Sequence, residues 1–157
     1  KSGVSKAMIS KIERGEASPT ATVLGRLSGA LSLTVSALLS RSDPVHHGVR
    51  RHADQPVWSD PATGYGRRQV LSGHNMPLEL VEVDLPARQQ VAMPASAFTF
   101  IRQTIWVLEG SLLFHEGDRV HHLDTGDCLE LGPPQDCMFE NKTAENCRYL
   151  VAVVRSA

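Results

Sequence analysis

Apolar residues recur at helical spacing in the first quarter of the chain and alternate with polar residues in most of the remainder. The helical spacing first predicts a helix between residues 4 and 14, with Ser5 as its N-cap and Gly15 as a left-handed residue at its C-terminus. The apolar stripe of this helix consists of Val4, Met8, Ile9 and Ile12.

Two further helices are expected before residue 41. Ser18 and Pro19 are read as the cap and the first-turn proline of the second helix, and Thr34 is read as the cap of a short third helix. Their apolar sides are Val23, Leu24, Leu27, Ala30 and Leu31 in the second helix, and Val35, Leu38 and Leu39 in the third.

From residue 63 onward the pattern is typical of short β-strands. The segment 116–119 reads Glu-Gly-Asp-Arg and predicts a hairpin turn between two of them. Seven or more closely spaced strands favour an all-β barrel or sandwich. The expected strands cover residues 67–71, 78–85, 98–108, 112–115, 120–123, 128–131 and 147–154.

Residues 42–60 have no sustained periodicity and contain prolines, so a connector is predicted there. Trp58 lies near its end, and we expect this side chain to anchor the connector on the second domain. The domain boundaries that follow are 1–41 for a helical domain, 42–60 for the connector and 61–157 for the β domain.

Charge divides along the same boundary. The first 41 residues contain six Lys or Arg and two Glu, whereas residues 61–157 contain eight Lys or Arg and twelve Asp or Glu. A basic front and an acidic back indicate that only the front meets nucleic acid. No apolar run approaches the roughly 20 residues that span a bilayer. Three cysteines without C-x-x-C spacing predict free thiols in a cytoplasmic protein.

The residue identities in segment 3–20, GVSKAMISKIERGEASPT, are more specific than the hydrophobic periodicity of the segment. A glycine before the helix, the run Ile-Ser-x-Ile-Glu-Arg-Gly and the sequence Ser-Pro-Thr occur together. This segment resembles the xenobiotic-response-element (XRE) family of helix-turn-helix regulators, which includes lambda-type repressors. The resemblance implies a DNA-binding module whose recognition helix is residues 5–14, and it implies that the chain shown starts inside that module.

Carried over by position, this family's recognition helix presents short and cationic side chains to DNA. Lysine donates to guanine, serine to several base edges, and an alanine methyl meets the thymine methyl, while cations also contact phosphates. The alternative for each residue is a solvated helix face. The predicted DNA-binding residues are Ser5, Lys6, Ala7, Ser10, Lys11 and Arg14.

The β region carries a second set of spaced motifs: Trp-Val-Leu-Glu-Gly at 106–110, Thr-Gly-Asp at 125–127, two prolines at 133–134, and Asn141. These intervals resemble the cupin family, a jelly-roll barrel, over residues 63–157. The resemblance implies a barrel whose mouth holds either a metal ion or an organic ligand.

The metal-binding positions of the cupin motifs are not retained. The glutamate position falls on Gln103, and the second-motif histidine falls on Cys137. The first-motif histidines become Ala97 and Thr99, or Ser96 and Phe98 at the longer spacing. Because a cupin ion needs two or three imidazoles and a carboxylate, we expect no metal, no cofactor and no catalytic residues. His115, His121 and His122 near the hairpin are expected to be exposed and not to bind metal.

A barrel mouth without a metal suits a small organic ligand held by apolar walls and a few polar groups. The alternative is that the same side chains only fill the barrel. The predicted ligand-binding residues are Phe98, Thr99, Gln103, Trp106, Cys137 and Phe139.

Together the two resemblances predict an α+β chain: a partial lambda-repressor-like helical domain followed by a cupin jelly roll. This plan is similar to one-component bacterial regulators, which implies a non-enzymatic homodimer without membrane attachment. Its helical domain would bind a double-stranded DNA operator, its cupin domain would dimerise and sense a small-molecule effector, and the connector would transmit the change. A repressor is the favoured form. The alternatives are a cupin metalloenzyme with an appended helix-turn-helix and an antitoxin-like protein-interaction module.

Overall fold

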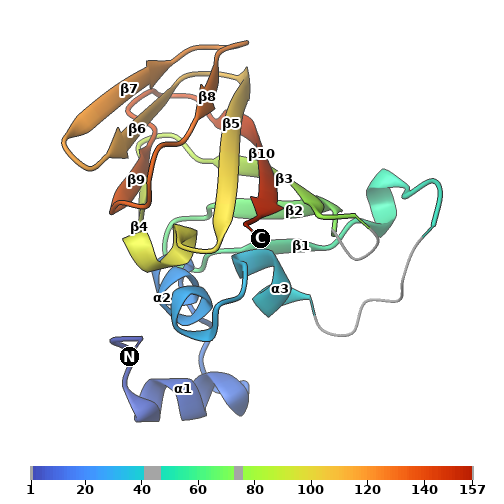
Figure 1. Cartoon of the computed structure of the whole chain (residues 1–157), viewed down its shortest axis with the longest axis vertical. Helices are drawn as coiled ribbons and strands as arrows, with labels where there is room; N and C mark the ends of the chain where they lie inside the picture. Colours follow the sequence, from blue (N-terminus) through green and yellow to red (C-terminus); the bar gives the residue numbers. More distant parts are fainter. Residues whose placement is uncertain (1, 41–46, 73–75, 157) are drawn as a thin grey trace.

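The computed structural model describes residues 2–40, 47–72 and 76–156. It has an α+β architecture in which three helices come first and two antiparallel β-sheets follow and face each other as a flattened barrel (Figure 1). The predicted fold class is therefore confirmed. The helices are α1 (Lys6–Glu13), α2 (Ala21–Leu31) and α3 (Val35–Leu39), with short 3₁₀ turns η1 (His52–Asp54) and η2 (Ala95–Phe98).

Side-chain hydroxyls cap all three helices. Ser5 Oγ accepts from the Met8 backbone N–H at 3.1 Å, and Thr34 Oγ1 accepts from that of Ala37 at 3.0 Å, as the sequence predicts. The expected cap at Ser18 is wrong, because Thr20 two residues later accepts from the Val23 N–H. Gly15 has a φ of +72° after α1, which is the conformation expected of it.

The two sheets divide the strands unequally. The larger sheet has the order β1-β2-β3-β10-β5-β8, and the smaller has the order β4-β9-β6-β7. The hairpin turn predicted at 116–119 joins β6 to β7, with Gly117 at a φ of +57°. The strands are β1 (Val57–Ser59), β2 (Gly66–Leu71), β3 (Leu78–Leu85), β4 (Gln90–Met93), β5 (Ile101–Glu109), β6 (Leu112–Glu116), β7 (Arg119–Leu123), β8 (Cys128–Glu130), β9 (Cys137–Glu140) and β10 (Cys147–Arg155).

Four segments differ from the sequence prediction. β4 and β9 lie outside the expected strands. The extended run expected from Phe98 begins only at Ile101, because η2 turns the chain directly after Pro94. The predicted connector contains β1, in which Trp58 pairs with Arg67 of β2 and packs against the barrel core. Trp58 thus anchors this segment as expected, and the larger sheet already begins within it.

Alternation along the strands fills the barrel. In β3, the buried Val81, Val83 and Leu85 alternate with outward residues, and β10 shows the same pattern with Tyr149, Val151 and Val153. Phe114 and Phe139 face them from the smaller sheet, with ring centroids 4.9 Å apart. These inner faces form one apolar core.

The helical segment packs directly on one end of this barrel through α2, which lies against β4 and η2 (Figure 1). Ala21 belongs to the barrel core, and Thr22 Oγ1 donates to the carbonyl oxygen of Ala92 at 2.8 Å. The side of α2 that faces the barrel carries the small residues Gly25 and Gly29.

This packing corrects the predicted apolar stripe of α2. Ala30 and Leu31 are exposed, Leu31 by 59%, whereas Gly25 and Ser28 are buried. The physical reason is close approach: a helix docks tightly on a 3₁₀ turn when the contact side lacks bulk. Larger apolar side chains then point elsewhere.

Gly29→Ala tests this contact. Glycine to alanine inside a helix normally gains about 0.5–1 kcal/mol. Here the added Cβ would lie 2.7 Å from the Ser96 backbone carbonyl carbon, which cannot move aside as a flexible side chain does. We therefore expect G29A to lose about 1–3 kcal/mol of unfolding free energy, measured by urea denaturation.

Gly25→Ala is the matched control, because its nearest new neighbour is the flexible end of Met93. A smaller loss is expected for G25A than for G29A. A G29A protein as stable as the wild type would show that α2 does not rest on η2.

Candidate functional site

The first candidate surface is the exposed side of α1. Lys6, Ala7 and Lys11 are exposed on this side, and Ser10 is partly buried. Ser10 lies one helical turn after Lys6, and Lys11 lies one turn after Ala7. α1 is the helix farthest from the barrel in Figure 1, so this side is open to solvent. The structure thus brings these four predicted DNA-binding residues onto one accessible face.

The two remaining residues of the predicted set already have local partners. Ser5 is the N-cap of α1, and Arg14 donates to both carboxylate oxygens of Glu16, at 2.8 and 3.0 Å. Arg14 also donates to Ser10 Oγ, which reaches it from one turn earlier. To contact a phosphate, Arg14 would therefore have to give up its exposed ion pair with Glu16, and losing such a pair costs little free energy.

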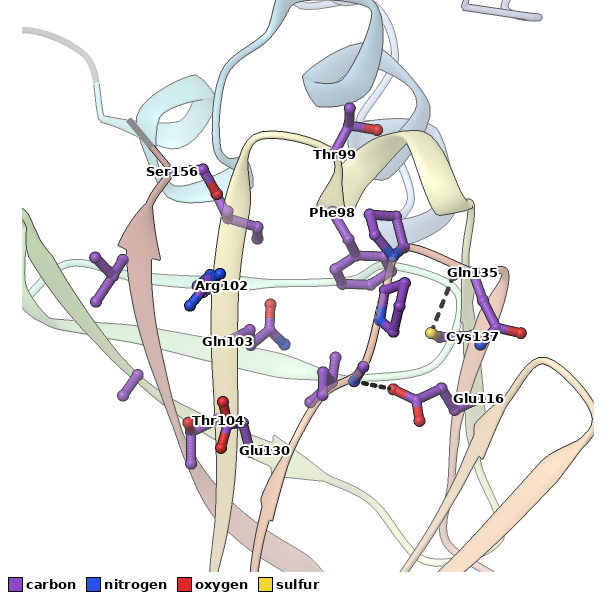
Figure 2. Close-up of a pocket in the computed structure, with 17 residues that line it drawn as sticks. Phe98, Thr99, Arg102, Gln103, Thr104, Glu116, Glu130, Gln135, Cys137 and Ser156 are labelled. Atoms are coloured by element: carbon purple, nitrogen blue, oxygen red, sulfur yellow. Dashed lines mark hydrogen bonds between the residues drawn. The ribbon is translucent and has the colours of Figure 1, made fainter.

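The second candidate surface is a groove of about 490 Å³ beside β5, where the loop 131–135 faces the C-terminal end of β10 (Figure 2). Of the predicted ligand-binding residues, Phe98, Thr99, Gln103 and Cys137 line it. Sequence reasoning missed the charged and amide side chains that join them, which are Arg102, Glu116, Glu130 and Gln135.

Two residues predicted to line the barrel mouth do not lie in this groove. Trp106 is 47% exposed on the outer face of the larger sheet, since it occupies an outward position of β5 between the buried Ile105 and Val107. Phe139 is buried in the core, stacked on Tyr149 with ring centroids 5.7 Å apart. The prediction for Trp106 is wrong because side chains alternate along β5, and the alternation points Trp106 away from the barrel interior.

Glu116 gives the groove a fixed carboxylate. It is 4% exposed, accepts from the Gly132 backbone N–H at 2.8 Å, and contacts His121 Nε2 at 3.2 Å. It therefore ties β6 to the loop that forms one wall. His115 similarly contacts Glu140 at 2.9 Å. The expectation that His115 and His121 are exposed is wrong for both, because each ring is partly buried against a carboxylate.

The side chains at the cupin metal positions do not suit an ion. Gln103 is a neutral amide, and burial, together with the nearby Glu116 and Asp136, raises the pKa of the Cys137 thiol to about 12. The thiol donates to the Gln135 carbonyl oxygen. Within the described part of the chain, no three His, Cys, Asp or Glu side chains converge. The groove is therefore suited to hydrogen bonding and apolar contact.

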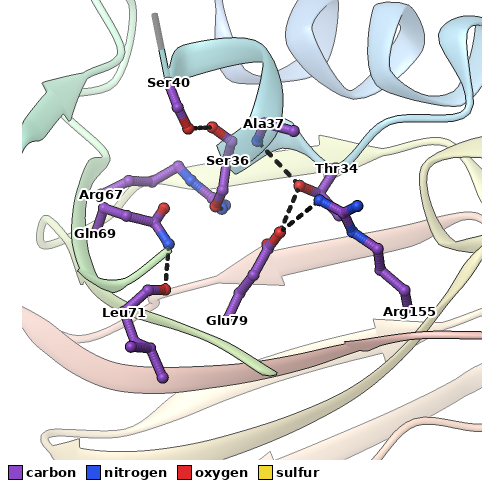
Figure 3. A network of polar contacts seen from close by, with 9 residues as sticks. All are labelled: Thr34, Ser36, Ala37, Ser40, Arg67, Gln69, Leu71, Glu79 and Arg155. Carbon is purple, nitrogen blue, oxygen red and sulfur yellow. Dashed lines mark hydrogen bonds and ion pairs between the residues drawn. The ribbon is translucent and has the colours of Figure 1, made fainter. Parts of the chain in front are cut away.

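A polar cluster joins α3 to the barrel interior (Figure 3). Thr34 Oγ1 donates to Glu79 Oε1 at 3.1 Å, and the Arg155 guanidinium lies 3.6 Å from the same oxygen. Glu79 is 2% exposed, and burial raises its pKa, against the effect of Thr34 and Arg155. Sequence reasoning missed this cluster, although a glutamate at an inward position of β3 was a readable signal.

Comparison with known proteins agrees with both halves of the structure. Residues 1–38 match the helix-turn-helix family HTH_3. The whole chain is similar to an HTH_3 family transcriptional regulator from Vibrio cholerae, with 25% identity, a TM-score of 0.75, and coverage of 98% of this chain and 82% of that one. The XRE-type resemblance of the N-terminal segment is therefore confirmed.

The barrel shares its fold with cupins. It is similar to the cupin domain of Cnp3 from Schizosaccharomyces pombe, at 10% identity and a TM-score of 0.52, covering 59% of this chain and 65% of that one. A predicted oxalate decarboxylase from Thermotoga maritima has 14% identity and a TM-score of 0.58, covering 69% and 99%. No curated protein sequence matches the chain. Among the described residues, no helix is long and apolar enough to cross a membrane.

The cysteines provide a test of the groove wall. Burial raises the pKa of Cys147 to about 11 and that of Cys137 to about 12, so on the order of one thiol in a thousand or fewer is ionised at pH 8. Cys128 is exposed. We expect iodoacetamide at pH 8 to modify Cys128 alone in the native protein and all three cysteines in urea, as read by peptide mass spectrometry. Rapid native labelling of Cys137 would contradict the buried, neutral thiol.

Proposed function

We propose that this chain is a sequence-specific DNA-binding transcription regulator that reads a double-stranded operator through α1. The observation that carries the proposal is the open face of α1, on which Lys6, Ala7, Ser10 and Lys11 stand within a segment that matches a helix-turn-helix family. A helix of this kind fits the major groove, and its lysines add salt-dependent affinity for phosphates.

The charge distribution supports binding by the helical end alone. The basic first 41 residues precede a barrel segment in which twelve acidic residues outnumber eight basic ones. An acidic barrel is repelled by DNA, so it keeps the helical end oriented toward the duplex. This arrangement suits a cytoplasmic regulator, and a repressor is the form we propose.

The groove beside β5 is the proposed effector site. Its lining combines the apolar Phe98 and Ile101 with the amides Gln103 and Gln135 and the carboxylate of Glu116. Its volume, about 490 Å³, lies within the range of small-molecule sites. Because its donor set does not suit a metal, we propose binding without turnover, and an effector acts only through its difference in affinity between two states of the protein.

A homodimer is the proposed assembly, because two recognition helices read a palindromic operator more tightly than one. The outer face of the larger sheet supports this proposal. Trp106 lies opposite Leu150 of β10, and Val154 lies opposite Leu78, so apolar side chains cover neighbouring strands. Ala152 and Val154 of this face also line the groove. An effector bound in the groove would therefore lie next to the second protomer of the proposed dimer.

Replacing a predicted DNA contact tests operator recognition. On an operator selected from a random DNA library, Lys6→Ala is expected to weaken binding by roughly 1–3 kcal/mol, about 5- to 150-fold, if Lys6 contacts a base. Fluorescence anisotropy at fixed salt measures the affinity. Lys142→Ala is the control, because Lys142 is a similarly exposed lysine on the barrel. Equal losses in the two variants would contradict recognition by α1.

A charge placed on the outer sheet face tests the dimer. Trp106→Glu should raise the dissociation constant of the dimer at least tenfold, roughly 1.4 kcal/mol, since it buries an unpaired carboxylate. Analytical ultracentrifugation measures it. Val120→Glu alters another exposed apolar residue, which lies on the other sheet, and should leave the dissociation constant of the dimer unchanged. A W106E protein that remains a dimer would assign the interface elsewhere.

A further inference from the structure

A second pocket lies at the seam between α3 and the barrel, away from the groove beside β5. It has a volume of about 180 Å³, and a cavity of about 150 Å³ accepts a benzene-sized molecule. One part of its wall is apolar and another is polar. The apolar lining is Leu39, Pro56, Val57 and Trp58, and the polar lining is Ser36, Ser40, Arg67 and Gln69.

The sheet register places an aromatic ring beside a cation in this pocket. Trp58 of β1 lies directly opposite Arg67 of β2 in an antiparallel pair, so the two side chains share the sheet face that α3 covers. Trp58 is partly buried against the barrel core and is held in place by it. Figure 3 shows Arg67 reaching from the sheet toward Ser36 of α3.

The Arg67 guanidinium is partly buried, and its hydrogen-bond partners among the described residues are neutral. Nη1 donates to Tyr65 Oη and Nη2 donates to Ser36 Oγ, each at 3.1 Å. The charge of Arg67 lowers the pKa of Glu79, but the Glu79 carboxylate contacts Thr34 and Arg155 instead of Arg67. A guanidinium has five N–H donors, so three remain after these two hydrogen bonds.

A half-buried cation is best compensated by an anion that also accepts hydrogen bonds. We propose that the seam pocket binds a small monocarboxylate with an apolar body, the carboxylate on Arg67 and the body between Trp58 and Leu39. The size and the apolar wall exclude inorganic phosphate as the preferred ligand, because phosphate would leave the indole and the leucine without a contact. Ser36 belongs to α3 and binds Arg67 directly, so this ligand touches both the helical segment and the barrel.

Calorimetric titration of the whole chain with three probes tests the site without DNA. Benzoate carries both features, benzyl alcohol keeps the ring without the charge, and acetate keeps the charge without the ring. We expect saturable binding of benzoate with one site per chain, and at least tenfold weaker binding of the other two. Equal affinity for benzyl alcohol, or no saturable binding of benzoate, would overturn the proposal. This comparison needs no variant, so it stands even if a substitution impairs folding.

Three glutamine variants locate the benzoate. Arg67→Gln should weaken binding at least tenfold. Arg68→Gln alters the next residue of β2, whose side chain bonds the His52 carbonyl on the opposite face, and should leave binding unchanged. Arg102→Gln removes the arginine of the other groove and should also leave it unchanged. Loss in R102Q with full binding in R67Q would place the carboxylate in the groove and overturn the seam site. These titrations contain no DNA, so a failure to bind benzoate can be told apart from a failure to bind an operator.

Discussion

The close contact between α2 and the barrel end sets most of the arrangement described here. Gly29 allows the helix to approach the Ser96 backbone, and Ala21 at the start of the same helix completes the barrel core. With α2 held in this way, Thr34 and Ser36 at the start of α3 reach Glu79 of β3 and Arg67 of β2, and α1 is the helix farthest from the barrel (Figure 1). The side of α1 that is predicted to contact DNA is accessible because the opposite end of the helical segment packs on the barrel.

The elements that could be predicted from the sequence are those with strong local signals. Ser5 and Thr34 are caps, and Gly117 marks a hairpin turn, because each meets a backbone requirement within a few residues of itself. The spaced motifs of the barrel likewise gave its fold. The start of α2 was misplaced because Ser18 and Thr20 are both good caps, and the choice between them depends on contacts with the barrel: the Asp60 carboxylate accepts from the Ala21 N–H.

The candidate sites were predictable to different degrees. The face of α1 follows from helical periodicity, so its residues lie together as expected. The groove depends on the pairing of distant strands and on the loop at 131–135, so Glu116, Arg102 and Glu130 could not be placed from local pattern. Trp106 could have been placed, since the alternation of β5 puts it outward between Ile105 and Val107. From the sequence, Arg67 and Glu79 are only polar residues at inward strand positions. Their partners Ser36 and Thr34 could not be predicted, because they are distant along the chain.

The hydroxyl contacts across the seam bear on the exchange of domains between proteins of this design. Thr34 and Ser36 belong to the helical segment, while their partners Glu79 and Arg67 belong to the sheet. A chimera that joins these helices to another barrel would remove one hydrogen-bond partner from the buried Glu79 carboxylate and one from the Arg67 guanidinium. A working chimera must therefore carry the contacting residues of β2, β3 and η2 together with the helices. The exchanged segment then extends beyond the connector into the barrel.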